Sequence, residues 1–314
     1  MQGTIHQPNL VPGQAIIASD GAAGPIASLP IMASWRQKSA LLLMVLFAII
    51  VIPSSLKAAK PELWFPVGET ITYQASWGGI PVAEARVWTE WVEEDGRDLL
   101  AIRVTITTGS IMSKIYPVKD FIESVVEPTT FLPLRFTRNL SEGRYRLHEV
   151  TTFDHHALKG HWKHLLKNNE ETFAIEPDTR DFLSFMFAMR RTALEAGSNY
   201  TYRVMADEKL YDLTVEGLKI ETIHLLNYGW VKSLKVEPKA TFQGLITRTG
   251  RLFMWISLDA RRLCTKASIS VPVASVKVLL QKVEGPGDDF WTNPGKNPGT
   301  LSTHHISTPK SDPP

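Results

Sequence analysis

The densest group of potential metal ligands is a histidine-rich segment near the middle of the chain. Its members are His148, Asp154, His155, His156, His161 and His164. Imidazole nitrogens and carboxylate oxygens bind zinc and copper, and the i, i+3 spacing of His161 and His164 fits one face of a helix. The segment is also rich in lysine, which is typical of a solvated hairpin or turn. We favour the surface loop and predict no metal site.

A catalytic site is the second possibility, and the sequence offers little for it. There is no G-x-S-x-G elbow, no H-E-x-x-H, no glycine-rich phosphate loop and no C-x-x-C. A hydrolase would need either Asp154 and the histidines, or a second polar set, to converge in a cleft. The second set is Asp181, Ser184, Arg190 and Asp259. We predict no catalytic residue and no cofactor, and we keep a metal-assisted hydrolase as the second alternative function.

Large apolar side chains form the third candidate site. Four of them follow the i, i+3, i+4, i+7 spacing of one helical stripe: Phe182, Phe185, Met186 and Met189. Such a stripe packs on an apolar surface, which a curved sheet provides. Core packing is the first interpretation, and lining of a ligand cavity is the alternative. With two tryptophans, the candidate ligand-lining residues are Trp77, Phe182, Phe185, Met186, Met189 and Trp255.

The stripe lies on the one helix that the sequence predicts clearly. Asp181 is a good N-cap, because its carboxylate can accept hydrogen bonds from the free backbone N–H groups of the first turn. Arg190 and Arg191 suit the last turn, where positive charge interacts favourably with the helix dipole. Gly197 is expected to close the helix. A short earlier helix is expected over residues 110–116.

Hydrophobic residues alternate with polar ones from residue 69 onward, which indicates strands buried on one face. The pattern covers 71–77, resumes over 83–88 after Gly78-Gly79, and resumes over 100–106 after Asp95-Gly96. Connections this short cannot make parallel crossovers. These three strands are therefore predicted to form an antiparallel meander.

Further short strands are predicted along the rest of the chain. They cover residues 121–126, 134–139, 145–153, 173–175, 200–205, 211–215, 231–236, 252–258 and 269–273. The alternation changes parity near Ala274-Ser275, so a bulge or bend is expected there as the last strand continues. The predicted fold is mainly β: an antiparallel open barrel or roll with one packed α-helix.

The N-terminal region contains a segment typical of protein export. Arg36 and Lys38 precede an apolar run over residues 40–52, which Pro53 ends. The run is shorter than the roughly 20 residues of a membrane-spanning helix, so a cleaved signal peptide is favoured over an uncleaved anchor. The predicted divisions are a disordered extension or a stretch before the true start (1–31), the signal peptide or anchor (32–59), a β-rich globular domain (60–284) and a disordered tail (285–314).

Charge and cysteine content exclude some functions. The chain of 314 residues carries 34 basic and 32 acidic side chains, which gives a net charge of +2. This near-neutral balance gives no electrostatic basis for binding nucleic acid, so we predict no such partner. Cys264 is the single cysteine, so no internal disulfide can form, and a small buried side chain is its favoured role.

Three motifs resemble a known family. The first covers residues 65–82 and includes Trp77-Gly78-Gly79, the second is Asp181-Phe182-Leu183-Ser184-Phe185 with Arg190, and the third is 255–262. Together they resemble domain-of-unknown-function family 3108, over about residues 64–283. The resemblance implies exported proteins of Gram-negative bacteria with a strand-rich fold. It implies no known activity, so it assigns no functional residue.

The sequence as a whole predicts an exported envelope protein without enzymatic activity. We expect it to bind an apolar ligand or lipid in the concavity of the curved sheet. A structural or assembly module is the first alternative, with another envelope protein as its partner. The expected location is the periplasm or cell envelope, with membrane contact through the N-terminal segment if that segment stays uncleaved.

Overall fold

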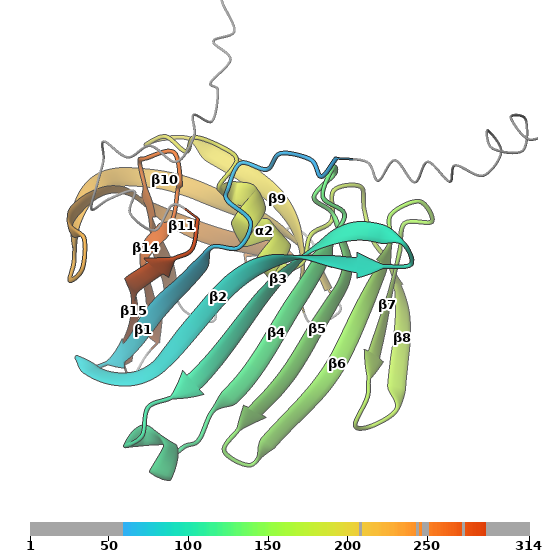
Figure 1. The fold of residues 1–314 in the computed structure, drawn as a ribbon, viewed down its shortest axis with the longest axis horizontal. Helices are drawn as coiled ribbons and strands as arrows, with labels where there is room; N and C mark the ends of the chain where they lie inside the picture. Colours follow the sequence, from blue (N-terminus) through green and yellow to red (C-terminus); the bar gives the residue numbers. More distant parts are fainter. Residues whose placement is uncertain (1–58, 207–208, 243–244, 247–250, 272–273, 287–314) are drawn as a thin grey trace, which may run out of the picture. The chain divides into compact units, whose positions relative to one another are not determined.

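A computed structural model describes residues 59–206, 209–242, 245–246, 251–271 and 274–286 (Figure 1). The described residues from Lys60 onward belong to one compact unit. The predicted extension (1–31), the apolar run and the tail from residue 287 lie outside the described residues. Within the described part, no helix is long and apolar enough to cross a membrane.

Strands make up most of this unit. The first eight are β1 (Thr70–Trp77), β2 (Ile80–Glu94), β3 (Arg97–Thr108), β4 (Lys119–Val126), β5 (Pro133–Glu142), β6 (Tyr145–Asp154), β7 (Lys159–His164) and β8 (Asn169–Ala174). The next seven are β9 (Asn199–Ala206), β10 (Lys209–Leu225), β11 (Gly229–Phe242), β12 (Leu245–Ile246), β13 (Arg251–Ser257), β14 (Cys264–Val271) and β15 (Ala274–Glu284). The 3-10 helix η1 (Met112–Lys114) and the α-helix α2 (Phe182–Met189) accompany them.

All these strands belong to one antiparallel sheet of 15 strands. β1 to β8 form a meander, and β9 to β15 form the other half, in which β12 pairs with β11 alone. β1 pairs with β15, from Thr70 opposite Glu284 to Trp77 opposite Val276, and so joins the two halves. The free edges are β8 and β9, so the sheet is open rather than closed. The predicted fold class is confirmed.

The first three strands have the predicted turns and pairing. Gly78 and Gly79 have φ angles of 56° and 88°, a left-handed backbone that glycine adopts without a steric penalty. The β1–β2 turn therefore depends on them. β2 pairs with both β1 and β3 in antiparallel register, which confirms the meander.

Three local predictions differ from the structure. β7 lies inside the histidine-rich segment, where the sequence favours a loop. The strand was not predicted because it is short, mostly polar, and buries only Gly160 and His164. β14 and β15 form a hairpin with Val271 opposite Ala274, so the change of parity marks a chain reversal rather than a bulge. α2 ends at Met189, and the N–H of Gly197 donates to the carbonyl of Gly217.

α2 lies between the two halves of the sheet (Figure 1), in contact with β4 and β9. Asp181 caps it as predicted, since its carboxylate accepts a hydrogen bond from the N–H of Ser184 at 2.8 Å. Leu183 and Phe187 pack into a core cluster with residues of the meander. Phe185 and Met189 pack into a second cluster with residues of the other half. The helix thus ties the two halves together through opposite faces.

Candidate functional site

An apolar cavity of about 230 Å³ lies beside α2. The meander contributes Ile71, Tyr73, Val87, Val104, Ile106 and Ile122, from β1 to β4. The helix contributes Phe182, Leu183, Met186, Phe187 and Met189. The remaining wall consists of Arg190, Arg262, Leu263, Cys264 and Val278. Segments far apart in the sequence therefore meet around one largely apolar space.

The predicted ligand-lining residues divide into two groups. Phe182, Met186 and Met189 line this cavity. Phe185 is buried in the second cluster, where its ring meets that of Tyr202 at a centroid distance of 5.1 Å. Trp77 is exposed at the end of β1. Trp255 is buried elsewhere, and its indole N–H donates to Oε2 of Glu221 at 2.7 Å.

A larger recess of about 370 Å³ has a different character. Its walls include the charged side chains of Asp178, Arg180, Arg203 and Asp212. Nε of Arg203 lies 2.7 Å from Oε2 of Glu176 and 3.9 Å from Oδ1 of Asp212. Opposite charges therefore pair in this recess. The smaller cavity is the better candidate for an apolar ligand, because few polar groups interrupt its walls.

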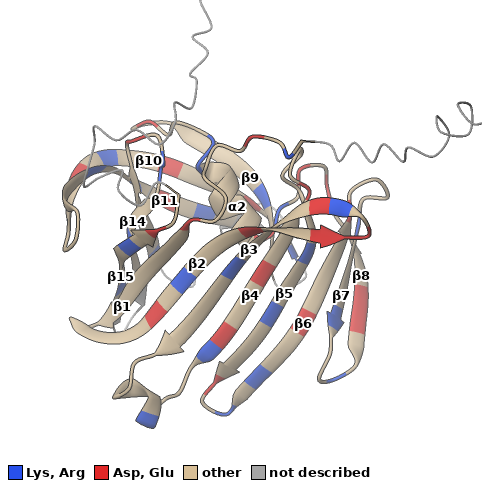
Figure 2. Cartoon of the chain, in the orientation of Figure 1, with Lys and Arg blue, Asp and Glu red and all other residues tan. Residues whose placement is uncertain are grey.

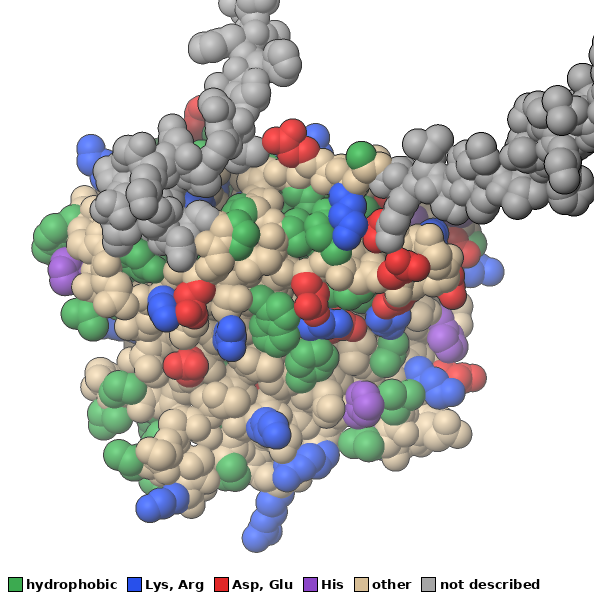
Figure 3. Space-filling view, viewed as in Figure 1, with side chains coloured by type: hydrophobic (Ala, Val, Ile, Leu, Met, Phe, Trp, Pro, Cys, Tyr) green, Lys and Arg blue, Asp and Glu red, His purple; other side chains and the backbone are tan. Residues whose placement is uncertain are grey.

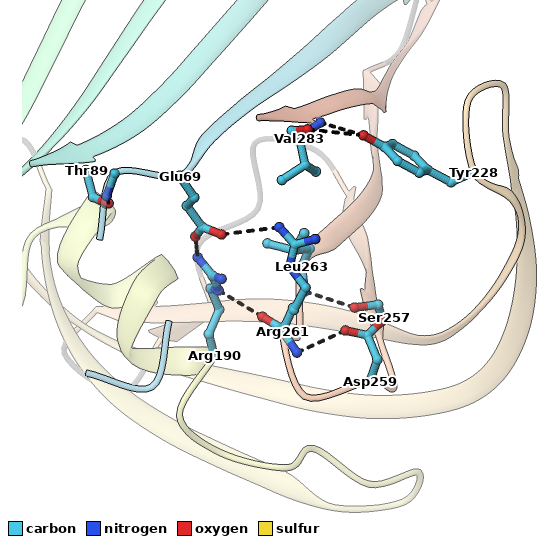
Figure 4. Close-up of polar contacts among 10 residues, drawn as sticks. Glu69, Thr89, Arg190, Tyr228, Ser257, Asp259, Arg261, Leu263 and Val283 are labelled. Atoms are coloured by element: carbon cyan, nitrogen blue, oxygen red, sulfur yellow. Dashed lines mark hydrogen bonds and ion pairs between the residues drawn. The ribbon is translucent and has the colours of Figure 1, made fainter. Parts of the chain in front are cut away.

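A buried ionic cluster lies at the C-terminal end of α2 (Figure 4). Nη1 of Arg190 pairs with Oε1 of Glu69, and Nη2 of Arg261 lies 3.5 Å from Oε2 of the same carboxylate. Nε of Arg190 also donates to the carbonyl of Arg261 at 3.0 Å. Oδ1 of Asp259 accepts from the backbone N–H of Arg261 at 2.9 Å. Two buried guanidinium groups thus share the carboxylate of Glu69.

Arg190 connects this cluster to the cavity. Its guanidinium lies 5.1 Å from the ring centroids of both Phe65 and Phe187. Its Nη2 atom is buried and has no hydrogen-bond partner among the described residues. A buried, unpartnered N–H donor is unfavourable unless a ligand or water accepts from it. Arg190 therefore gives the cavity wall a positive group with spare hydrogen-bonding capacity.

Two titratable groups of the cavity wall, Tyr73 and Cys264, are neutral near pH 7. Burial raises the pKa of the Tyr73 phenol well above its ordinary value. Burial also raises the pKa of the Cys264 thiol to about 12. The thiol is therefore a poor nucleophile and packs as a small apolar group, as the sequence predicts.

Asp181, at the other end of α2, is buried, and among the described residues no cation lies within ion-pair distance of its carboxylate. Oγ of Ser124 donates to its Oδ2 at 2.5 Å, and the N–H of Ser184 donates to its Oδ1 at 2.8 Å. Burial raises the pKa of this carboxyl to about 6, although these hydrogen bonds lower it in part. Its geometry is that of a helix cap, which fixes the start of α2.

The groups considered for catalysis do not converge. Asp181 and Ser184 bond to each other at the start of α2, whereas Arg190 follows its last residue, a helix length of about 13 Å away. The histidines belong to β6, β7 and the turn between them, and His161 and His164 point to opposite faces of β7 because residues three apart in a strand do so. Across the residues that the structure describes, no cluster of three or more His, Cys, Asp or Glu side chains could hold a metal ion.

Sequence reasoning missed Glu69, Arg261 and Tyr73. Glu69 stands immediately before a strand, and Arg261 follows Asp259 in a short turn, where charged residues are usually solvated. Their one sequence signal is membership of the motifs that carry the family resemblance. Glu69 is buried against Arg190 and Arg261, which lie 121 and 192 residues later in the chain. Local sequence patterns do not reveal such distant partners.

Comparisons with known proteins show a family and supply no activity. A search of curated proteins found no match. A crystal structure of a beta-barrel-like protein of domain of unknown function DUF1849 from Brucella abortus is similar at a TM-score of 0.49 and 12% identity, covering 70% of this chain and 98% of that one. A DUF1089 family protein from Pseudomonas aeruginosa gives a TM-score of 0.31 and 12% identity, covering 62% and 91%. The model of the protein family of unknown function DUF3108 matches residues 72–281, more than half of the chain, so this protein belongs to that family.

Proposed function

We propose that this domain binds an apolar ligand, such as a lipid acyl chain, in the cavity beside α2. The observation that carries the proposal is the cavity itself, with about 230 Å³ lined mainly by apolar side chains of α2 and of both halves of the sheet. Its walls offer few polar groups to hold ordered water, so an apolar ligand would gain by burying its surface against them. The predicted leader makes an envelope location part of the proposal.

The charges at the cavity favour an amphiphile with an anionic headgroup. Arg190 and Arg262 both line the cavity, and the carboxylate of Glu69 is already shared by Arg190 and Arg261. Nη2 of Arg190 still lacks an acceptor among the described residues. A ligand carboxylate would accept a charge-assisted hydrogen bond there, while its alkyl chain contacts Met186 and Ile106.

Calorimetric titration of the purified full chain tests both parts of the proposal. Laurate and lauryl alcohol have the same chain length and differ in headgroup charge. We expect laurate to bind at least about tenfold more tightly, because a hydrogen bond to a charged group contributes roughly 1.5–3 kcal/mol. Equal affinities would refute the anionic headgroup, and no binding of either would refute the apolar ligand.

A cavity-filling variant tests the location. Met186→Trp places a larger side chain in the cavity wall and should weaken laurate binding at least about tenfold. Ile220→Trp, at an exposed position on β10, is the matched control and should bind as the unaltered protein does. A thermal melt of each variant checks that it is folded. Unchanged binding by folded Met186→Trp would move the site elsewhere.

A further inference from the structure

The connections of the β1–β8 meander alternate between the two ends of its strands, which form two opposite edges lined by turns. Because successive strands are antiparallel, the β1–β2 (78–79), β3–β4 (109–118), β5–β6 (143–144) and β7–β8 (165–168) connections lie at one edge, here named the η1 edge. The β2–β3 (95–96), β4–β5 (127–132) and β6–β7 (155–158) connections lie at the opposite edge. Figure 1 shows the η1 edge at the bottom of the meander.

Large apolar side chains are exposed at every connection of the η1 edge. They include Trp77 and Ile80 at the first, Ile111 and Ile115 at the second, Tyr145 at the third and Leu166 at the fourth. Ile111 and Ile115 are 78% and 74% exposed. Among the described residues of the opposite edge, Leu158 is the one large exposed apolar side chain, at 37%. Exposed apolar groups gathered along one edge indicate a surface for interaction.

The two edges also differ in charge (Figure 2). Exposed basic residues at the η1 edge are Lys114, Lys119, Arg144, Arg146 and Lys167. The carboxylates near them are Glu142, Glu170 and the buried Asp120, fewer than the basic residues, and burial and Asp120 raise the pKa of Glu142. The turns and strand ends at the opposite edge carry Glu93, Glu94, Asp95, Asp98, Glu127 and Asp154, against Arg97 and Lys159. The η1 edge is therefore basic and the opposite edge acidic.

Hydrophobic and basic side chains lie next to each other along the lower edge of Figure 3. A bilayer that contains anionic lipids accepts both kinds, because apolar side chains enter the interface while Lys and Arg are attracted to the headgroups. Separate turn tips with cations between them suit this planar, deformable surface. We propose that the η1 edge docks the domain on an anionic phospholipid bilayer.

The position of the cavity is consistent with this docking surface. Ile106 and Ile122, in its wall, lie close to the ends of β3 and β4 that the η1 connection joins. Docking would bring that wall near the bilayer. The proposal does not depend on ligand binding, since it rests on the exposure and charge of the turns.

A fluorescent label at one turn tests insertion directly. Ile115→Cys in the full chain would carry an environment-sensitive maleimide dye at the η1 edge. Cys264, the half-buried native thiol, is replaced by Ala in every labelled variant, so that the dye attaches at the introduced cysteine alone. With vesicles that contain phosphatidylglycerol, the dye emission should shift to the blue and increase at least twofold. Vesicles of phosphatidylcholine alone should give a much smaller change.

Leu226→Cys is the matched control for this label. Leu226 is 76% exposed on the β10–β11 connection, outside the η1 edge. The N-terminal apolar run is present in both variants, so any membrane binding by that run affects both alike. A response at residue 115 without one at residue 226 supports the proposal. No response at 115 overturns it in favour of a protein partner, and an equal response at both also overturns it.

Charge reversal supplies an independent arm. Lys114→Glu with Arg144→Glu, in the Ile115→Cys background, should raise the vesicle concentration for half-maximal response at least about tenfold. The control pair Arg97→Glu with Lys159→Glu reverses two exposed charges at the opposite edge and should change it less than threefold. Equal effects of the two pairs would show general electrostatics rather than docking through the η1 edge, and would overturn the proposal.

Discussion

The two edges of the meander use large apolar residues in opposite ways. At the edge where β1 begins, Phe65 and Phe131 are buried, and Trp64 and Phe187 complete an aromatic cluster with them. Their rings meet edge to face, with centroids 4.6 Å apart for Trp64 and Phe131 and 4.9 Å apart for Phe65 and Phe187. At the η1 edge, Ile111 and Ile115 contribute little to any core because they are mostly exposed. The same residue types stabilise the fold at one edge and remain available for contacts at the other.

Polar groups show the same contrast. Glu69, Arg190 and Asp181 are buried around α2, where each depends on a few specific partners. Lys114 and Arg144 at the η1 edge are solvated. Substitutions should therefore change stability strongly on the buried side and weakly at the η1 edge, and three predictions test that contrast.

The largest effect is expected from Glu69→Gln. It removes the carboxylate that two buried guanidinium groups share and leaves their charge uncompensated. Removing one partner of a buried ion pair typically costs about 3–5 kcal/mol. We expect that loss in the free energy of unfolding, measured by urea denaturation.

Glu84→Gln is the control for this prediction. Glu84 is an exposed carboxylate on β2, and its substitution should change the free energy of unfolding by less than about 0.5 kcal/mol. Similar values for the two variants would mean that the buried cluster is not the stabilising feature described above.

A smaller, pH-dependent effect is expected from Asp181→Asn. Because the folded-state pKa of Asp181 is raised to about 6 from an ordinary value of 3.8, its contribution to stability is complete below about pH 4 and is lost as pH rises through 6. The loss should amount to about 2–3 kcal/mol. Asparagine keeps the cap and cannot ionise.

The free energy of unfolding should therefore fall between pH 4 and pH 7.5 for the unaltered protein. For Asp181→Asn this fall should be absent. Arg180 is the nearby cation that interacts with this carboxylate, and it stays charged over the whole range. Parallel pH profiles for the two proteins would contradict the raised pKa.

The smallest effect is expected from Ile115→Ser at the η1 edge. Since Ile115 is 74% exposed, its loss should change the free energy of unfolding by less than about 0.5 kcal/mol. Thermal and urea unfolding both measure this. A loss above about 1.5 kcal/mol would show that the η1 edge belongs to the stabilising core after all.

Local patterns predicted the parts of the fold that depend on neighbours in sequence. The glycine turn at 78–79 follows from φ preferences, and the Asp181 cap follows from a bond to a residue three positions later. The strand β7 was missed because its exposed polar residues weaken the alternation. Of the six predicted lining residues, Phe182, Met186 and Met189 line one cavity because they lie on one side of α2. The positions of Trp77 and Trp255 depend on the pairing of their strands in the sheet, which the spacing of residues in the sequence does not reveal.

The sequence alone determined the strand-rich class, the position of the helix and its cap, because alternation, turns and caps are short-range. Tertiary structure decided which of these elements meet. It pairs β1 with β15, buries Glu69 against two arginines from later parts of the chain, and aligns four turns along one edge. These features arise from the packing of distant segments, where burial and charge compensation depend on the whole fold rather than on any one stretch of residues.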